Sequence, residues 1–123
     1  MVAWIQDEPG ASALQTLLLN ADAGNLQLLM SWYNVAETFY TVAKRKKLTV
    51  AEEFLARLPS LPIRLVLPDQ NDIMAAARVK ASHSVALGDA FAIALAQTEG
   101  ASVVTGDQEI RRCKLVPVDW VGR

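Results

Sequence analysis

Three acidic residues stand where a sheet of parallel strands usually binds its ligands. Glu37 lies in the first turns of a helix that follows an apolar strand, Asp89 stands near the start of an Ala-rich helix, and Asp107 directly follows a third apolar segment. Ligands of such sheets bind beyond the carboxyl ends of the strands, so we expect the three acids at one edge. Neighbouring carboxylates repel one another unless a cation lies between them, and hard oxygen ligands suit Mg²⁺ or Mn²⁺.

Two further features would support such a site. Asn34 precedes Glu37 by three residues and therefore shares its helix face. Gly106 allows a sharp turn that would aim Asp107 at the sheet edge. Each acid also has an ordinary explanation when taken singly: an exposed helix residue, a helix-start acid and a turn residue. The shared edge, rather than any one acid, favours a site.

The elements that would position these acids alternate between strand and helix. We expect helices over 11–20, 34–47, 49–58, from 69 or 71 to 83, and 87–96, and strands over 26–30, 64–67, 101–104 and 115–118. Short apolar strands between helices predict an α/β fold of three layers, with a mostly parallel sheet covered by helices on both faces. At 123 residues, 52% of them hydrophobic, the chain is expected to form a single domain over residues 1–123.

Local signals predict several helix ends. Thr49 and Glu52 have the spacing of a capping box that would begin one helix. Asp69 or Asn71 is expected to cap the next helix, and Gly100 to stop the Ala-rich one.

Composition restricts the function classes. A formal net charge of -1 and a pI near 5.8 argue against a protein that coats nucleic acid through a broad basic field. The single Cys113 cannot form an intramolecular disulfide, which favours a reducing cytoplasm. The first residues lack the basic region of a signal peptide, and no apolar run is long enough to span a bilayer, so no membrane association is expected. The mean hydropathy of +0.20 suggests that a partner covers some apolar surface.

Three short stretches resemble the acidic motifs of a known family. Asn34–Glu37, Leu87–Ala92 and Val104–Asp107 resemble, in order and spacing, the second, third and fourth acidic motifs of PIN domains, especially those of VapC-type toxins. The resemblance covers nearly the whole chain. It implies a PIN-like fold, a Mg²⁺- or Mn²⁺-dependent endoribonuclease with RNA as substrate, a cognate antitoxin protein as inhibitor, and a homodimer.

The resemblance also implies roles for individual residues. Glu37, Asp89 and Asp107 would bind one or two Mg²⁺ ions, so that an activated water attacks a phosphodiester and the 3′-oxygen leaves. Thr105 and Asn34 would orient a water or a carboxylate.

Four basic residues are candidates for RNA contacts: Lys44, Arg45, Arg111 and Arg112. The first two belong to a basic helix end, which is also what compensation of the helix dipole requires. Arg111 and Arg112 follow the Asp107 turn and would reach a substrate phosphate or simply cover the surface.

Two departures from the family pattern bear on activity. The pattern opens with the central strand of the sheet, which ends in an Asp, whereas this sequence starts within the helix that follows it. A start site placed too far downstream, a truncation or a degenerate family member would each explain this. Ala86 also stands where the family more often has a polar residue. The alternative function is therefore a catalytically inactive PIN-fold module that keeps antitoxin or dimer contacts. A phosphoacceptor receiver domain fits less well, because Asp69 resembles a helix cap.

Overall fold

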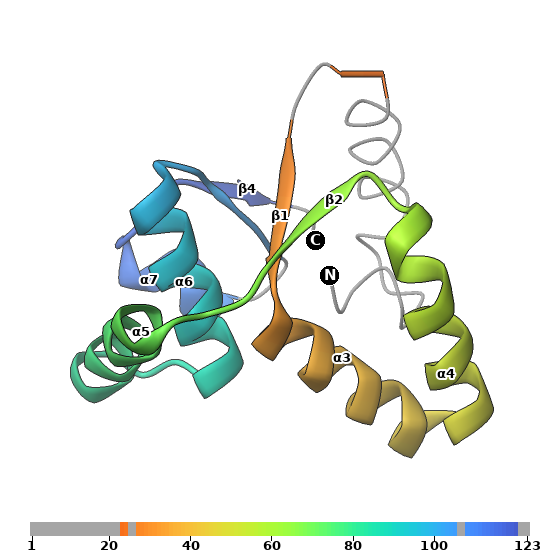
Figure 1. The fold of residues 1–123 in the computed structure, drawn as a ribbon. Coiled ribbons are helices and arrows are strands. Elements are labelled where there is room, and N and C mark those ends of the chain that lie inside the picture. The colour runs from red at the N-terminus through yellow and green to blue at the C-terminus, as the bar shows by residue number, and fades with distance from the viewer. Residues whose placement is uncertain (1–22, 25–26, 106–107, 121–123) are drawn as a thin grey trace.

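The fold is a mixture of short parallel strands and helices (Figure 1). The computed structural model describes the backbone of residues 23–24, 27–105 and 108–120. Its elements are β1 (Leu28–Ser31), α3 (Trp32–Arg45), α4 (Leu48–Arg57), the 3-10 helix η1 (Leu58–Ser60), β2 (Ile63–Val66), α5 (Gln70–Ser82), α6 (Leu87–Glu99), β3 (Val103–Thr105), α7 (Gln108–Cys113) and β4 (Val118–Trp120).

The first half of this order forms one packing unit. β1 and β2 are parallel neighbours, with Leu28 opposite Ile63 at the start of the register. α3 and α4 pack against each other on one side of the two strands (Figure 1). Their shared core consists of four buried apolar residues, one each from β1, α3, α4 and η1. These residues are Met30, Val35, Phe54 and Leu58.

The second half has a core of its own around α6. This helix is rich in Ala and is buried on several sides, with Ile93 fully inaccessible to solvent. It packs against α5 and contacts β3, which pairs with β4 in parallel. α6 ends at Gly100, whose left-handed backbone (φ 63°) lets the chain turn away without the steric cost of a Cβ.

Hydrogen bonding divides the four described strands into two pairs. β1 pairs with β2 and β3 pairs with β4, and within the described residues no ladder joins one pair to the other. α6 contacts both β1 and β3, so this helix connects the two halves.

The sequence predicted the fold class correctly, and most element boundaries lie within a few residues of expectation. The predicted capping box at Thr49 and Glu52 is wrong. α4 already starts at Leu48 after Lys47, whose side chain makes no capping bond, so Thr49 lies inside the helix. α7 was not expected, because six residues are too few to show a helical period. β4 starts at Val118, later than predicted, and the helix expected over 11–20 lies outside the described residues.

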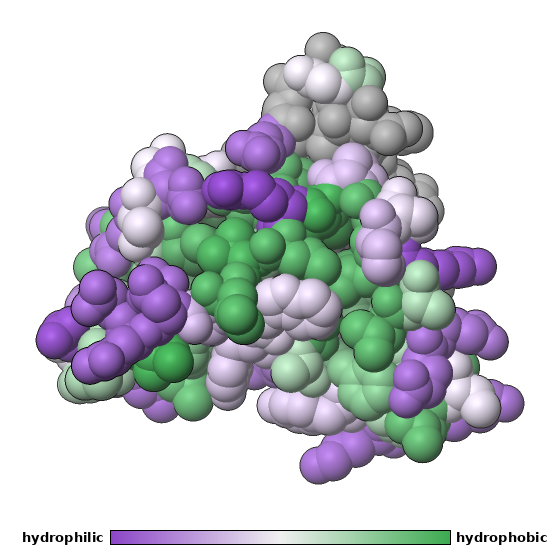
Figure 2. All heavy atoms as spheres, viewed as in Figure 1, coloured by the Kyte–Doolittle hydropathy of each residue, from purple (hydrophilic) through white to green (hydrophobic). Residues whose placement is uncertain are grey.

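One face of the molecule has apolar side chains at its centre. In Figure 2 hydrophobic residues gather over the β1 and β2 region, between polar surfaces over α5 and α4. Large hydrophobic side chains are also exposed where β2 passes into α5, among them Leu67 at 78% exposure, Ile73 and Met74. In the described part of the chain, none of the helices has the length and apolarity that a membrane crossing demands.

Candidate active site

The start of α3 follows directly from β1. Ser31 ends the strand, is buried, and its hydroxyl accepts a hydrogen bond from the Tyr33 amide at 3.1 Å, which caps the helix. Asn34 therefore stands in the first turn of α3. Its side-chain Nδ2 donates to the carbonyl oxygen of Gly88 at 2.8 Å. This bond joins the first turn of α3 to the first turn of α6, although 54 residues separate the two partners.

The carboxylate of Glu37 lies against the backbone of Gly88. A Cβ added to Gly88 would overlap both carboxylate oxygens of Glu37 and its Cδ. Gly88 itself is buried. The absence of a side chain at position 88 therefore creates the space that the Glu37 carboxylate fills. Because Asp89 is the next residue along α6, the first two predicted acids belong to one small region.

A stacked pair of rings holds the two helix starts together. Tyr33 and Phe91 lie with their ring centroids 4.2 Å apart and their planes 7° from parallel. Tyr33 also packs against the core around α6. Since Tyr33 precedes Glu37 by one helical turn, the stack fixes the orientation of α3 from which Glu37 extends toward Gly88.

The surroundings of Glu37 disfavour the charged form of its carboxyl group. Burial raises the pKa of Glu37 above its ordinary value of 4.5. Within the described residues its carboxylate has no hydrogen bond and no ion pair that would offset the lost hydration. The pKa of Tyr33 is raised as well, first by burial, then by the charge of Glu37 and by Tyr40. A cation beside Glu37 would remove this penalty, and acids with such perturbed environments are enriched at functional sites.

Asp89 stands in the first turn of α6, where the helix dipole favours a negative charge. It is half-buried, and it takes part in a further interaction within the structure. The residue before the helix, Ala86, makes no side-chain capping bond. The sequence departure at position 86 thus removes a group that would otherwise bond the first-turn amides.

The other predicted site residues are described only in part. Thr105 is the last residue of β3, but its side chain, and the whole of Asp107, lie outside the described residues. Among the side chains that the structure describes, no group of three His, Cys, Asp or Glu residues could hold a metal. The described donors are the two acids Glu37 and Asp89, whose oxygen atoms fit a hard divalent cation.

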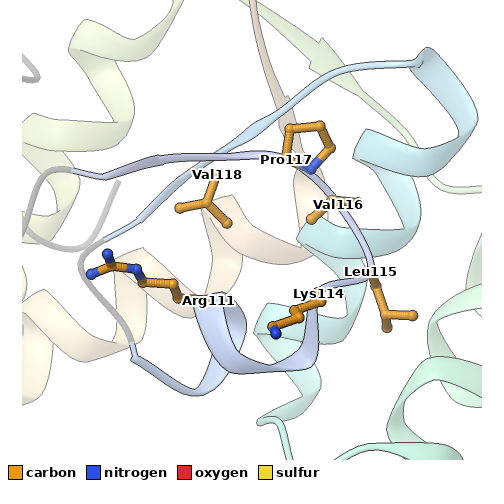
Figure 3. Close-up of a pocket in the computed structure, with 6 residues that line it drawn as sticks. All are labelled: Arg111, Lys114, Leu115, Val116, Pro117 and Val118. Carbon is orange, nitrogen blue, oxygen red and sulfur yellow. The ribbon is translucent and has the colours of Figure 1, made fainter.

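The basic candidates lie on two surfaces. Lys44 and Arg45 are exposed at the end of α3. Arg111 and Arg112 are exposed on α7, where Arg111 borders a shallow hollow between this helix and β4 (Figure 3). The other residues that line this hollow are Lys114, Leu115, Val116, Pro117 and Val118. Among the described side chains, its lining contains two cations, Arg111 and Lys114, and no acid.

The comparison with protein families identifies the family of the chain. The family model described as PIN domain matches residues 1–115 of the 123, so the chain belongs to the PIN domain family. Members of this family are generally nucleases, which indicates an enzyme of the hydrolase type. No curated protein and no solved structure gave a significant match.

Two features of the site were not predicted. The role of Gly88 depends on where Glu37 lies, and the sequence does not reveal that the starts of α3 and α6 meet. The involvement of Tyr33 has a signal in the sequence, because Tyr33 and Tyr40 stand one turn on either side of Glu37 and share its helix face.

Proposed function

We propose that this PIN domain is a metal-dependent endoribonuclease and the toxin of a toxin–antitoxin pair. The observation that carries the proposal is the contact between Glu37 and Gly88. It brings the half-buried carboxylate of Glu37 on α3, whose pKa burial raises, next to the acid that follows Gly88 on α6. The family to which the chain belongs supports a nuclease.

Glu37 and Asp89 would hold Mg²⁺ or Mn²⁺, together with Asp107, which the resemblance assigns to the same set. The ion, when bound, supplies an acidified water and positive charge beside the scissile phosphate. The chain's own residues would do the positioning. Asn34 ties the Gly88 carbonyl to α3, which keeps the two helix starts in register, and Thr105 at the end of β3 would orient a carboxylate or a water.

The proposal includes protein partners. We expect a cognate antitoxin to cover the acidic site and two copies of the chain to form a homodimer. The apolar surface over β1 and β2 (Figure 2) and the exposed Leu67 support the presence of a protein interface, because apolar surface of this kind is usually covered by a partner.

The test is cleavage of a structured RNA by the wild-type chain in Mg²⁺ or Mn²⁺, with an EDTA control. Asp89→Asn removes one charge without changing the size of the side chain. Arg78→Ala, on the exposed surface of α5, is the matched control. We expect metal-dependent cleavage that Arg78→Ala retains and Asp89→Asn reduces by about 100-fold or more. A metal ion contributes several kcal/mol to such a reaction, and each 1.36 kcal/mol is tenfold in rate.

Cleavage that persists in EDTA, or that Asp89→Asn leaves intact, would reject the proposed metal site. Absence of cleavage on every RNA tried would favour the inactive binding module. The same assay on a chain extended upstream by a strand ending in Asp tests whether the further carboxylate of the family pattern raises the rate.

A further inference from the structure

One face of α3 leads from the acidic site to the basic end of the helix. Tyr33, Glu37, Tyr40 and Lys44 are spaced by four, three and four residues, which places them in one line along the helix. The buried residues of α3, Val35, Thr38 and Val42, lie on the opposite side. The line therefore faces away from the core that α3 shares with β1, α4 and η1.

Contacts show that this line is continuous. Both Glu37 and Tyr40 act electrostatically on Tyr33, so the three side chains lie near one another. The Lys44 ammonium lies over the Tyr40 ring, 5.8 Å from its centroid. By the rise of an α-helix, Lys44 is about 10.5 Å along the axis from Glu37.

The two halves of the line have different surroundings. Tyr33 is stacked on Phe91, and Glu37 lies against Gly88, so α6 covers the first half. Tyr40 is 49% exposed and Lys44 is exposed, so the second half is open to solvent. Beyond Lys44 the chain continues with three more exposed basic residues, Arg45, Lys46 and Lys47. A half-exposed aromatic ring beside a basic run suits single-stranded nucleic acid, because bases stack on rings and phosphates pair with cations.

We propose that single-stranded RNA leaves the acidic site along this face of α3, with one base stacked on Tyr40 and the adjoining phosphate held by Lys44. The inference rests on the proposed nuclease function and names two residues, Tyr40 and Lys44, that would hold the strand outside the acidic site. The small net charge of the whole chain gives no general attraction for RNA. The strand is therefore held locally, by the Tyr40 ring and the cations from Lys44 to Lys47, which we call the track.

The experiment measures binding in EDTA, so that cleavage plays no part. The probe is a short fluorescein-labelled oligoribonucleotide without self-complementarity, titrated by anisotropy and compared with the same strand annealed to its complement. Tyr40→Leu removes the ring but keeps an apolar side chain, and Tyr40→Phe keeps the ring. Lys44→Ala removes the cation, with Arg78→Ala as the control at a distant exposed cation.

We expect Tyr40→Leu to weaken binding of the single strand by about tenfold, and Tyr40→Phe to bind like the wild type. Binding of the duplex should not change in Tyr40→Leu, because paired bases cannot stack on the ring. Lys44→Ala should lower the slope of log K against log salt concentration by about 0.7, and Arg78→Ala should leave it unchanged.

The proposal is overturned if the wild type binds no single strand, or if Tyr40→Leu and Tyr40→Phe bind it equally well. Equal losses for single strand and duplex would also overturn it. The outcome is separable from that of the nuclease. Cleavage that Tyr40→Leu leaves unchanged keeps the nuclease and rejects the track, whereas Tyr40-dependent binding without any cleavage keeps the track and rejects the nuclease.

Discussion

Acids gather near helix starts in two regions of this molecule, and their environments differ. At the start of α5, the Asp69 side chain accepts a hydrogen bond from the Asp72 amide at 2.9 Å, and the Asp72 side chain accepts one from the Asp69 amide at the same distance. This reciprocal capping box satisfies two backbone donors that a helix start leaves unpaired. Both acids are thereby explained by stability alone.

Glu37, near the start of α3, has no such explanation. Glu37 does not bond a helix amide; it is partly buried against Gly88, and burial raises its pKa. α6 starts at Leu87, and the preceding Ala86 provides no side-chain cap. A cap lowers the free energy of the folded chain, whereas a desolvated carboxylate without a partner raises it. Glu37 is therefore kept at a cost to stability, which is typical of a functional site.

Among the variants that test the difference between these two regions, Gly88→Ala should have the largest effect, and the effect should be on RNA cleavage. The added Cβ would displace the Glu37 carboxylate from its position, and misplacing a reacting group by about 1 Å can cost about 100-fold in rate. We expect RNA cleavage to fall by about tenfold or more. The melting temperature should not fall, because Ala favours a helix more than Gly does and Glu37 can move aside.

A second substitution distinguishes this explanation from a general disturbance of α6. Glu37→Asp in the Gly88→Ala background shortens the side chain that the new methyl group would displace. Partial recovery of cleavage in the double variant supports the steric account. A melting temperature that falls together with activity in Gly88→Ala would instead assign Gly88 to packing.

At the start of α5, a substitution should lower stability and leave RNA cleavage unchanged, and its effect should be smaller than that of Gly88→Ala. Asp69→Ala removes one half of the capping box and should cost about 1 kcal/mol of unfolding free energy, which corresponds to about 4 °C in melting temperature for a chain of this size. Asp69→Asn should lose little, since Asn caps nearly as well. Cleavage per folded molecule should be unchanged in both variants, and a loss of activity in Asp69→Ala would contradict a purely structural role.

The smallest expected effect is a change with pH in the stability of Glu37→Gln relative to the wild type. Because the folded pKa of Glu37 lies above its ordinary value of 4.5, the folded chain keeps this proton to higher pH than the unfolded chain. The contribution of Glu37 to stability is thus fully present below pH 4.5 and is lost as pH rises through the folded pKa. In EDTA, Glu37→Gln should therefore gain stability relative to the wild type as pH rises.

Thermal unfolding of both chains at several pH values between 4 and 8 measures this difference. The exposed acid Glu53 on α4 provides the matched control, as Glu53→Gln should show no such gain. A difference between Glu37→Gln and the wild type that shrinks toward neutral pH would show that the folded chain stabilises the charged form of Glu37.

The sequence predicted those parts of the fold that depend on local signals. Asp69 caps α5 and Gly100 ends α6 because a side-chain acceptor and a residue without Cβ meet requirements set by the adjacent backbone. The capping box predicted at Thr49 is wrong because packing, not a local cap, sets where α4 begins. Buried Ala51 and Phe54 define the inner face of this helix, and the chain enters it from an extended Lys47.

The sequence proposes the acids of the candidate site, which stay a prediction, but it does not encode their geometry. The motif resemblance identified Glu37 and Asp89, and the rule for parallel sheets placed them at one edge. The contact of Glu37 with Gly88, the bond from Asn34 to the Gly88 carbonyl and the Tyr33–Phe91 stack are all long-range. They depend on the angle at which α3 meets α6, which no local pattern encodes.

Metal-dependent thermal unfolding tests the central claim most directly, because it needs no knowledge of the RNA substrate. The wild type, Glu37→Gln and Asp69→Ala would be melted at neutral pH with EDTA and with Mn²⁺. Binding to the folded state alone stabilises it by about 2.7 kcal/mol at a metal concentration 100 times Kd. We predict that Mn²⁺ raises the melting temperature of the wild type and of Asp69→Ala but not that of Glu37→Gln. An equal rise in all three chains, or none in the wild type, would contradict a metal site at Glu37.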